Sequence, residues 1–489
     1  MKAIVIGAGF GGIAAALRLR AKGYEVTLLE RCPAVGGRAQ VFEREGFLHD
    51  AGPTVITAPF LFEELFSLFG ENLADFVKLV PVKPWYRFYF KDGTTFNYGG
   101  TLEETLAEIQ KIEPRDVAGY LALLAHSKKI YEVGFEKLSS QPFHRFWTMI
   151  KQVPALLRLK NYETVWQMVS RYLKNEKLRQ AFSIQPLLVG GNPFDTTSIY
   201  GLIHYLERKH GVYFAMGGTG ALTRALADLM IRQGIEVRLS TSVASIQIEA
   251  GVARGVVLDD GSILGADRVV SNADAAYLYR EMVAPSQRTM ACGLKLKAAH
   301  YSMGLYVLYF GTKKRYPEVA HHTIWMGGRY RELLEDIFHK KILADDFSLY
   351  VHRPTATDVR FAPEGCDSFY VLCPVPNLQS GVDWTKAEPE LRSRIIDALD
   401  STLLPGLKGV ITSEFAQTPM DFRDNYRSIH GAGFSVAPLF RQSAWFRFHN
   451  KAEGIKNLYL VGAGTHPGAG LPGVLCSAKV VDALIPPAS

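Results

Sequence analysis

Residues 2–12 read KAIVIGAGFGG, an apolar run followed directly by a glycine-rich turn. The apolar run predicts a strand buried on both faces, as in a parallel sheet. Gly7, Gly9 and Gly12 match the pattern G-x-G-x-x-G. The first glycine permits a tight turn, the second lets the backbone approach a pyrophosphate, and the third allows a helix to pack closely on the strand. A following helix and a second strand ending at Glu30 complete a βαβ unit, and the helix N-terminus supplies amides for phosphate.

Three further features favour FAD as the bound dinucleotide. The carboxylate of Glu30 can accept hydrogen bonds from the adenosine ribose hydroxyls, although a plain exposed strand-end charge is the alternative. Gly37 and Arg38 can place bare backbone and a guanidinium near a second phosphate, the alternative being a turn with a solvated arginine. Residues 457–465, NLYLVGAGT, predict a strand that delivers small residues against the cofactor. Because only one complete fingerprint is present, we expect no bound NAD.

Composition excludes several classes of protein. The 489 residues are 48% hydrophobic and 21% charged, which is typical of well-packed globular proteins of about three structural units. A net charge of +7 without a recognisable module gives no indication of nucleic-acid binding. Five scattered cysteines without C-x-x-C spacing indicate neither disulfides nor a zinc site.

The strand pattern at the N-terminus leaves no room for a secretory signal, so we expect a cytoplasmic protein. Residues 3–17 and 457–478 lack charge, but their glycines predict buried strand-turn-helix segments rather than membrane spans.

The sequence resembles the bacterial phytoene desaturases of carotenoid synthesis, which are flavoproteins with an amine-oxidase-like fold. The resemblance runs essentially from end to end. It rests on six motifs: GAGFGG at 7–12, DAGPTV at 50–55, LVGGNP at 188–193, GGTG at 217–220, SNAD at 271–274 and GTHPGAG at 464–470.

The resemblance also implies where the cofactor lies. The segment 52–56 would lie under the isoalloxazine, Val243 would cradle the adenine, and backbone amides around 471–474 would face the pyrimidine end of the flavin. There the dipole of the last helix could stabilise negative charge on the reduced flavin. The residues expected to contact FAD are Gly7, Gly9, Phe10, Gly12, Glu30, Gly37, Arg38, Thr54, Val55, Val243, Gly464, Thr465, Leu471 and Val474.

The reaction that the resemblance implies is successive dehydrogenation of 15-cis-phytoene towards neurosporene or lycopene. We expect hydride to pass to flavin N5, a proton to leave the neighbouring carbon, and oxygen or a membrane quinone to take the electrons. The polyene cation is a strong acid, so positioning matters more than a finely tuned base. His430 and His466, in glycine-rich segments, are the candidate proton acceptors, with ordinary hydrogen-bonded histidines as the alternative. The adjacent residues His321 and His322 should point apart in any regular element, so no metal site is expected.

An insoluble polyene must come from a bilayer, and residues 143–182 offer a candidate docking face. Eight lysines and arginines lie in this stretch, against two glutamates. Basic residues with interfacial aromatics favour peripheral binding to anionic lipid, and the alternative is an apolar core beneath a solvated face. Two apolar stripes recur there at helical spacing: Phe143, Phe146, Trp147 and Ile150, then Val165, Met168, Val169, Tyr172 and Leu173.

We therefore expect an α/β protein with a split Rossmann-type FAD-binding domain, an antiparallel-sheet substrate domain and a helical, membrane-associating subdomain. The FAD-binding domain takes residues 1–84, 211–290 and 450–489, the substrate domain 85–102 and 291–449, and the helical subdomain 103–210. The alternatives are another polyene enzyme (a diapophytoene or hydroxycarotenoid desaturase, a ketolase or a carotene isomerase), an amine oxidase with an aromatic cage around its flavin, or a non-catalytic, flavin-stabilised membrane scaffold.

Overall fold

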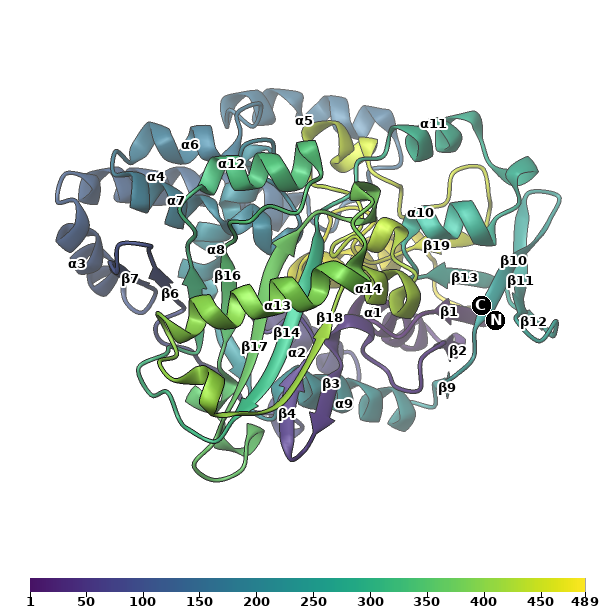
Figure 1. Ribbon diagram of the computed structural model, residues 1–489. Helices are drawn as coiled ribbons and strands as arrows, with labels where there is room; N and C mark the ends of the chain where they lie inside the picture. Colours follow the sequence, from purple (N-terminus) through teal and green to yellow (C-terminus); the bar gives the residue numbers. More distant parts are fainter. Residues whose placement is uncertain (489) are drawn as a thin grey trace.

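A five-stranded parallel sheet forms the centre of the computed structural model, which describes residues 1–488. Strands from three distant parts of the chain lie side by side in the order β19-β13-β1-β2-β9 (Figure 1). The first strand, helix and second strand occur where the glycine-rich motif predicts them. The strands are β1 (Lys2–Ile6), β2 (Glu25–Leu29), β9 (Glu236–Arg238), β13 (Arg268–Ser271) and β19 (Leu458–Leu460).

Strand β1 is buried on both faces, as its continuous apolar run predicts. Ala3 and Val5 pack against the helices α1, α9 and α15 on one side of the sheet. Ile4 and Ile6 face the opposite side, where a three-stranded antiparallel sheet covers them. The uncharged segments at both ends of the chain are therefore strand-turn-helix units of the core. The covering elements are α1 (Phe10–Ala21), α9 (Gly218–Arg232), α15 (Leu471–Leu484), β10 (Val243–Glu249), β11 (Val252–Leu258) and β12 (Ile263–Gly265).

A second, seven-stranded sheet has the order β18-β14-β17-β16-β15-β6-β7 and is antiparallel except where β15 pairs with β6. The β6–β7 hairpin turns at Asp92 and Gly93. The short strands β15 and β16 lie between β14 and β17 in the chain, and the 17-residue helix α13 lies between β17 and β18. The elements are β6 (Tyr86–Tyr89), β7 (Thr95–Tyr98), β14 (Gly304–Thr312), β15 (His322–Trp325), β16 (Leu349–His352), β17 (Asp367–Val375), β18 (Ile411–Gln417) and α13 (Trp384–Asp400).

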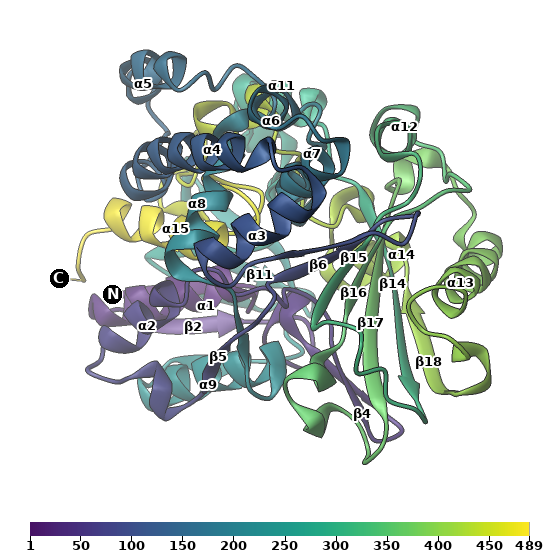
Figure 2. The same ribbon diagram turned by 90° about the vertical axis from the view of Figure 1, so that its left-hand side faces the viewer.

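The segment that was expected to be helical forms six helices, which Figure 2 shows together above the parallel sheet. They are α3 (Leu102–Ile112), α4 (Asp116–Tyr131), α5 (Phe146–Arg158), α6 (Val165–Tyr172), α7 (Glu176–Ser183) and α8 (Leu202–His210). The smaller elements are β3 (Val41–Arg44), β4 (Phe47–Asp50), β5 (Leu79–Pro81), β8 (Tyr213–Ala215), α2 (Phe60–Ser67), α10 (Ala275–Tyr277), α11 (Met290–Ala298), α12 (Tyr330–Glu335) and α14 (Pro419–Tyr426).

The two apolar stripes considered for membrane docking have different environments. Val165, Met168 and Val169 on α6 are fully buried in the core between the helices and the β6–β7 hairpin, so for this stripe the docking interpretation is wrong. On α5, by contrast, Phe146 and Trp147 are 49% and 71% exposed. Across residues 1–488, no helix has both the length and the apolarity needed to span a bilayer.

Candidate active site

A cavity of about 620 Å³, called the main cavity below, begins at the carboxyl ends of the parallel strands. Ligands bind at this edge of open α/β sheets. Ile6 and Leu29, the last residues of β1 and β2, line its first part together with the glycine-rich turn. Its other end lies between the helices and the seven-stranded sheet, where Leu206 and Met326 are among the lining residues. The main cavity therefore joins a dinucleotide-type cleft to an apolar chamber.

The glycine-rich turn places bare backbone against the main cavity. Gly7, Gly9 and Phe10 line it, and within residues 1–488 no side chain caps the N-terminus of α1, so its first amides stay available to an anion. Gly12, which was expected among the FAD contacts, does not line the cavity, and a Cβ there would stand 1.9 Å from the carbonyl oxygen of Gly7. The third glycine thus serves the helix-strand packing that its place in the motif predicts, rather than lining the cofactor cleft. The side chain of Asn272 packs closely against the same turn: a Cβ at Gly9 would stand only 2.8 Å from Asn272 Nδ2.

Glu30 is a buried lining residue, which rules out an exposed strand-end charge. Its Oε2 accepts a hydrogen bond from the Ala8 amide at 2.7 Å and its Oε1 accepts one from the Cys32 amide at 2.8 Å. A carboxylate oxygen can accept a second hydrogen bond, so both oxygens can still serve ribose hydroxyls. Val243 lines the same part of the main cavity.

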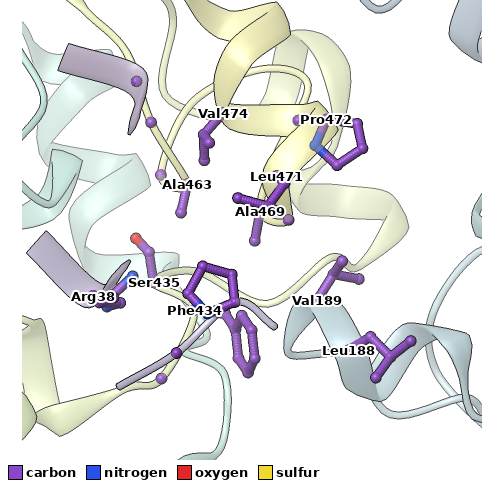
Figure 3. Close-up of a pocket in the computed structure, with 18 of the residues that line it drawn as sticks. Arg38, Leu188, Val189, Phe434, Ser435, Ala463, Ala469, Leu471, Pro472 and Val474 are labelled. Atoms are coloured by element: carbon purple, nitrogen blue, oxygen red, sulfur yellow. The ribbon is translucent and has the colours of Figure 1, made fainter. Parts of the chain in front are cut away.

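Arg38 points into the main cavity, as Figure 3 shows. Its Nη2 donates to Ser428 Oγ at 3.2 Å, but its buried Nε has no hydrogen-bond partner in the described chain. Burial lowers the pKa of Arg38, and the nearby carboxylate of Asp274 opposes that effect. A buried guanidinium with an unused N–H is costly unless an anion pairs with it. The arginine therefore fits a phosphate-bearing ligand, as predicted.

Small residues and a helix N-terminus close the opposite wall. Figure 3 shows Ala463, Ala469 and Leu471 on one side of the main cavity, across from Arg38 and Phe434. Of the predicted FAD contacts, Gly37, Thr54, Val55, Gly464, Leu471 and Val474 all line the cavity.

Thr465 is, after Gly12, the second expected FAD contact that the structure places away from the main cavity. It is fully buried and does not line the main cavity. Its Oγ1 donates to the Gly462 carbonyl at 3.0 Å and accepts from Asn450 Nδ2 at 3.2 Å. Thr465 therefore shapes the turn that presents its neighbours.

The two histidine candidates have different positions. His466 lines the main cavity, its Nε2 lies 2.9 Å from the Leu138 carbonyl oxygen, and burial lowers its pKa to about 4. His430 is not among the lining residues, and its ring packs edge-on against Tyr301 at 5.0 Å between centroids. Proximity to the cavity therefore favours His466 over His430.

Glu207 on α8 is a lining residue that sequence analysis missed. It is fully buried, and its Oε1 accepts a hydrogen bond from Tyr86 Oη at 2.9 Å. Its Oε2 has no hydrogen-bond partner among residues 1–488. Burial raises the pKa of Glu207 to about 7, against the opposing effects of the hydrogen bond from Tyr86 and of the nearby Arg208 guanidinium. In the sequence, Glu207 begins the charged run Glu-Arg-Lys at a helix end, which is typical of a solvated surface and carries no signal of burial.

The expectation that the side chains of His321 and His322 point apart is wrong. The rings of His321 and His322 lie 4.5 Å apart between centroids, and both face the ring of His352. The alternation of side chains along a strand does not apply to this pair, because β15 begins only at His322.

Comparisons with known proteins agree with this geometry. The family model described as flavin containing amine oxidoreductase matches residues 10–481. The chain is similar to a phytoene desaturase (lycopene-forming) of Pantoea ananas, with 47% identity over 98% of both chains. It is 44% identical to a phytoene desaturase (neurosporene-forming) of Rhodobacter capsulatus, covering 100% of this chain and 94% of the relative. A crystal structure of an oxidoreductase from Methanosarcina mazei shares the fold with a TM-score of 0.68 at 16% identity, covering 98% of this chain and 99% of that one.

Proposed function

The chain belongs to the flavin containing amine oxidoreductases and, among them, to the bacterial phytoene desaturases, and from this premise we propose that it desaturates 15-cis-phytoene in successive steps to neurosporene or lycopene. It is an FAD-dependent oxidoreductase acting on CH–CH bonds. The observation that carries the proposal is the main cavity, in which a cleft suited to phosphate, with the unpaired Nε of Arg38, continues into an apolar chamber. A long polyene suits such a chamber, because contact between the polyene and the apolar lining removes both surfaces from water, which is favourable.

We assign the binding of FAD to residues 1–84, 211–290 and 450–489, and that of the polyene mainly to 85–102 and 291–449. Bound FAD supplies the acceptor for a hydride from an allylic carbon. Glu30 would hold the ribose hydroxyls of this cofactor, and Arg38 with the amides at the start of α1 would hold its diphosphate. The N-terminus of α15 at Leu471 also lines the main cavity, and its positive dipole end would favour negative charge on a flavin bound there.

Glu207 is the residue that we propose as proton acceptor. Once an allylic carbon has lost hydride, the C–H bond on the neighbouring carbon breaks. Its electron pair forms the new double bond, and the proton passes to Glu207 Oε2, the carboxylate oxygen that Tyr86 leaves free. A carboxylate with a pKa of about 7 is a weak base, but it suffices for so acidic a cation. His466 is the alternative acceptor, because it lines the same cavity.

We further propose that the protein binds peripherally to anionic membranes through α5 and α11. Figures 1 and 2 both place these helices at the same edge of the molecule. Trp147 on α5 and Met290 on α11 are 71% and 86% exposed, and Phe440 is exposed beside them in the rim of the main cavity. Met149 and Leu156, on the inner side of α5, also line the cavity. A polyene leaving the bilayer at α5 would thus enter the cavity directly, with oxygen or a membrane quinone taking up the electrons.

The test mixes the FAD-loaded protein anaerobically with liposomes that contain phytoene. We expect the flavin absorbance to bleach while a product with a longer conjugated system forms, with one two-electron desaturation for each flavin reduced. A fully saturated hydrocarbon of similar length is the control, because it has no allylic C–H bond. Flavin that stays oxidised with phytoene would refute desaturation, and folded protein without affinity for FAD would refute the cofactor assignment.

A further inference from the structure

Three histidines meet next to Tyr350, one of the residues that line the main cavity. His321 directly precedes β15, His322 begins it, and His352 ends the neighbouring strand β16. His322 and His352 are register partners in the sheet, so their side chains leave the same face. The three residues are at most 4% exposed, and each offers a nitrogen within 4.8 Å of those of the other two.

In two of these rings, one nitrogen makes a hydrogen bond and the second nitrogen makes none. His321 Nδ1 lies 2.7 Å from Thr357 Oγ1, and His322 Nδ1 lies 2.7 Å from Tyr350 Oη. The Nε2 atoms of both, and both nitrogens of His352, are buried without a hydrogen-bond partner in residues 1–488. Metal-binding histidines have this arrangement: one nitrogen is fixed by an outer partner and the other is directed at the ion.

Asp50, at the end of β4, adds an oxygen donor to the three imidazoles. Its Oδ1 accepts a hydrogen bond from the Thr219 amide at 2.9 Å. Its Oδ2 has no hydrogen-bond partner in the described chain and lies 3.7 Å from His352 Nε2. Asp50 is fully buried, so its unpaired oxygen carries charge in a dry environment, which is unfavourable unless a cation is near.

We propose that His321, His322, His352 and Asp50 bind one Zn²⁺ ion. Three imidazoles and one carboxylate are a donor set that zinc takes in tetrahedral sites. Three donors at most 4.8 Å apart fit around a centre about 2.8 Å from each, so contraction by less than about 1 Å reaches a zinc–nitrogen distance of roughly 2.0 Å.

The ion would be structural and would connect two parts of the protein. Asp50 continues directly into residues 51–55, which line the main cavity, whereas the histidines belong to the seven-stranded sheet. Tyr350 Oη also lies 2.6 Å from Thr54 Oγ1, so the site supports the wall expected under the flavin. Zinc has no redox chemistry and would not compete for the electrons of the reaction. The proposal goes beyond desaturation and stands without it.

The test measures metal in the full-length, FAD-loaded protein prepared without a histidine tag. After equilibration with Zn²⁺ and removal of free metal, we expect about one zinc per chain by mass spectrometry. His352→Gln should bind almost none, whereas His339→Gln, at an exposed histidine outside the cluster, should bind as much as the parent. Chelation should lower the melting temperature of the parent and leave that of His352→Gln unchanged.

Cobalt supplies a readout that does not depend on any variant. Co²⁺ in a closed site of this donor set shows the visible absorption of tetrahedral coordination, and we expect these bands in the parent protein. A parent protein that takes up neither zinc nor cobalt would show that the cluster holds only buried water, which overturns the proposal. Full zinc content in His352→Gln would overturn it as well.

Discussion

Replacing Glu207 by glutamine tests the proton acceptor most directly. Glutamine keeps the shape of the side chain and an oxygen that can accept the hydrogen bond from Tyr86, but it cannot take a proton from the polyene cation. General-base catalysis contributes about 10²- to 10⁴-fold, and the acidity of the cation places this case at the lower end. We therefore expect Glu207→Gln to slow single-turnover product formation by about 100-fold.

The pH dependence follows from the pKa of about 7. Only the carboxylate accepts a proton, so the rate in the parent protein should rise with pH up to about 7 and then level off. In Glu207→Gln that dependence should vanish. Tyr86→Phe removes the hydrogen bond that favours the carboxylate, so it should move the midpoint of the profile to higher pH.

Stability measurements separate this effect from unfolding. The pKa of Glu207 is raised in the folded protein from an ordinary value of about 4.5 to about 7. The protonated acid is therefore the favoured folded form, and its contribution is complete below about pH 4.5 and lost as pH rises to about 7. The difference corresponds to about 3 kcal/mol of unfolding free energy at high pH. Glutamine is neutral at every pH, so at pH 8 the variant should be at least as stable as the parent.

The assay measures the desaturated product by chromatography after anaerobic mixing with phytoene in liposomes, where each oxidised flavin supports one desaturation. Glu332→Gln, at an exposed glutamate on α12, is the matched control and should leave the rate unchanged. A Glu207→Gln rate within about twofold of the parent, with the same pH profile, would show that the proton goes elsewhere.

Four further substitutions test the phosphate site, the docking surface on α5 and the two histidine candidates. Arg38→Ala should weaken FAD binding by about 10- to 100-fold in a fluorescence titration, because a charge-assisted hydrogen bond of about 1.5–3 kcal/mol is lost; unchanged affinity would remove Arg38 from the phosphate site. Trp147→Glu should reduce flotation with anionic liposomes several-fold, whereas the same change at Val359, which is exposed outside α5 and α11, should not; equal losses would contradict docking through α5. His466→Ala and His430→Ala should leave single-turnover flavin reduction and product formation unchanged, and a large loss in His466→Ala would make that residue the acceptor instead.

The cofactor cleft could be predicted well from the sequence. Gly7, Gly9, Glu30 and Arg38 lie within one short stretch, and all four line the main cavity. Such a motif can be recognised in the sequence because each of its residues meets a local requirement of the backbone, such as a tight turn or a helix N-terminus beside a phosphate. Thr465 was less predictable, since neighbouring residues in a turn point in different directions and only the packed structure shows which of them face the ligand.

The chamber and its polar groups could not be predicted in the same way. Glu207 has the sequence context of a solvated helix end, and the stripe on α6 has the same periodicity as the exposed stripe on α5. Helical periodicity reports that a face is apolar, but it does not report whether protein, lipid or water covers that face.

The sequence by itself therefore determined the cofactor, the family and the parallel sheet, because these depend on backbone geometry encoded over a few neighbouring residues. The tertiary structure alone decided which carboxylate is buried in the wall of the main cavity and which helix is exposed. It also decided that His321, His322 and His352 lie together and that His352 lies beside Asp50. Those arrangements arise from side chains that are far apart in the chain and are brought together by burial, and no local pattern records such contacts.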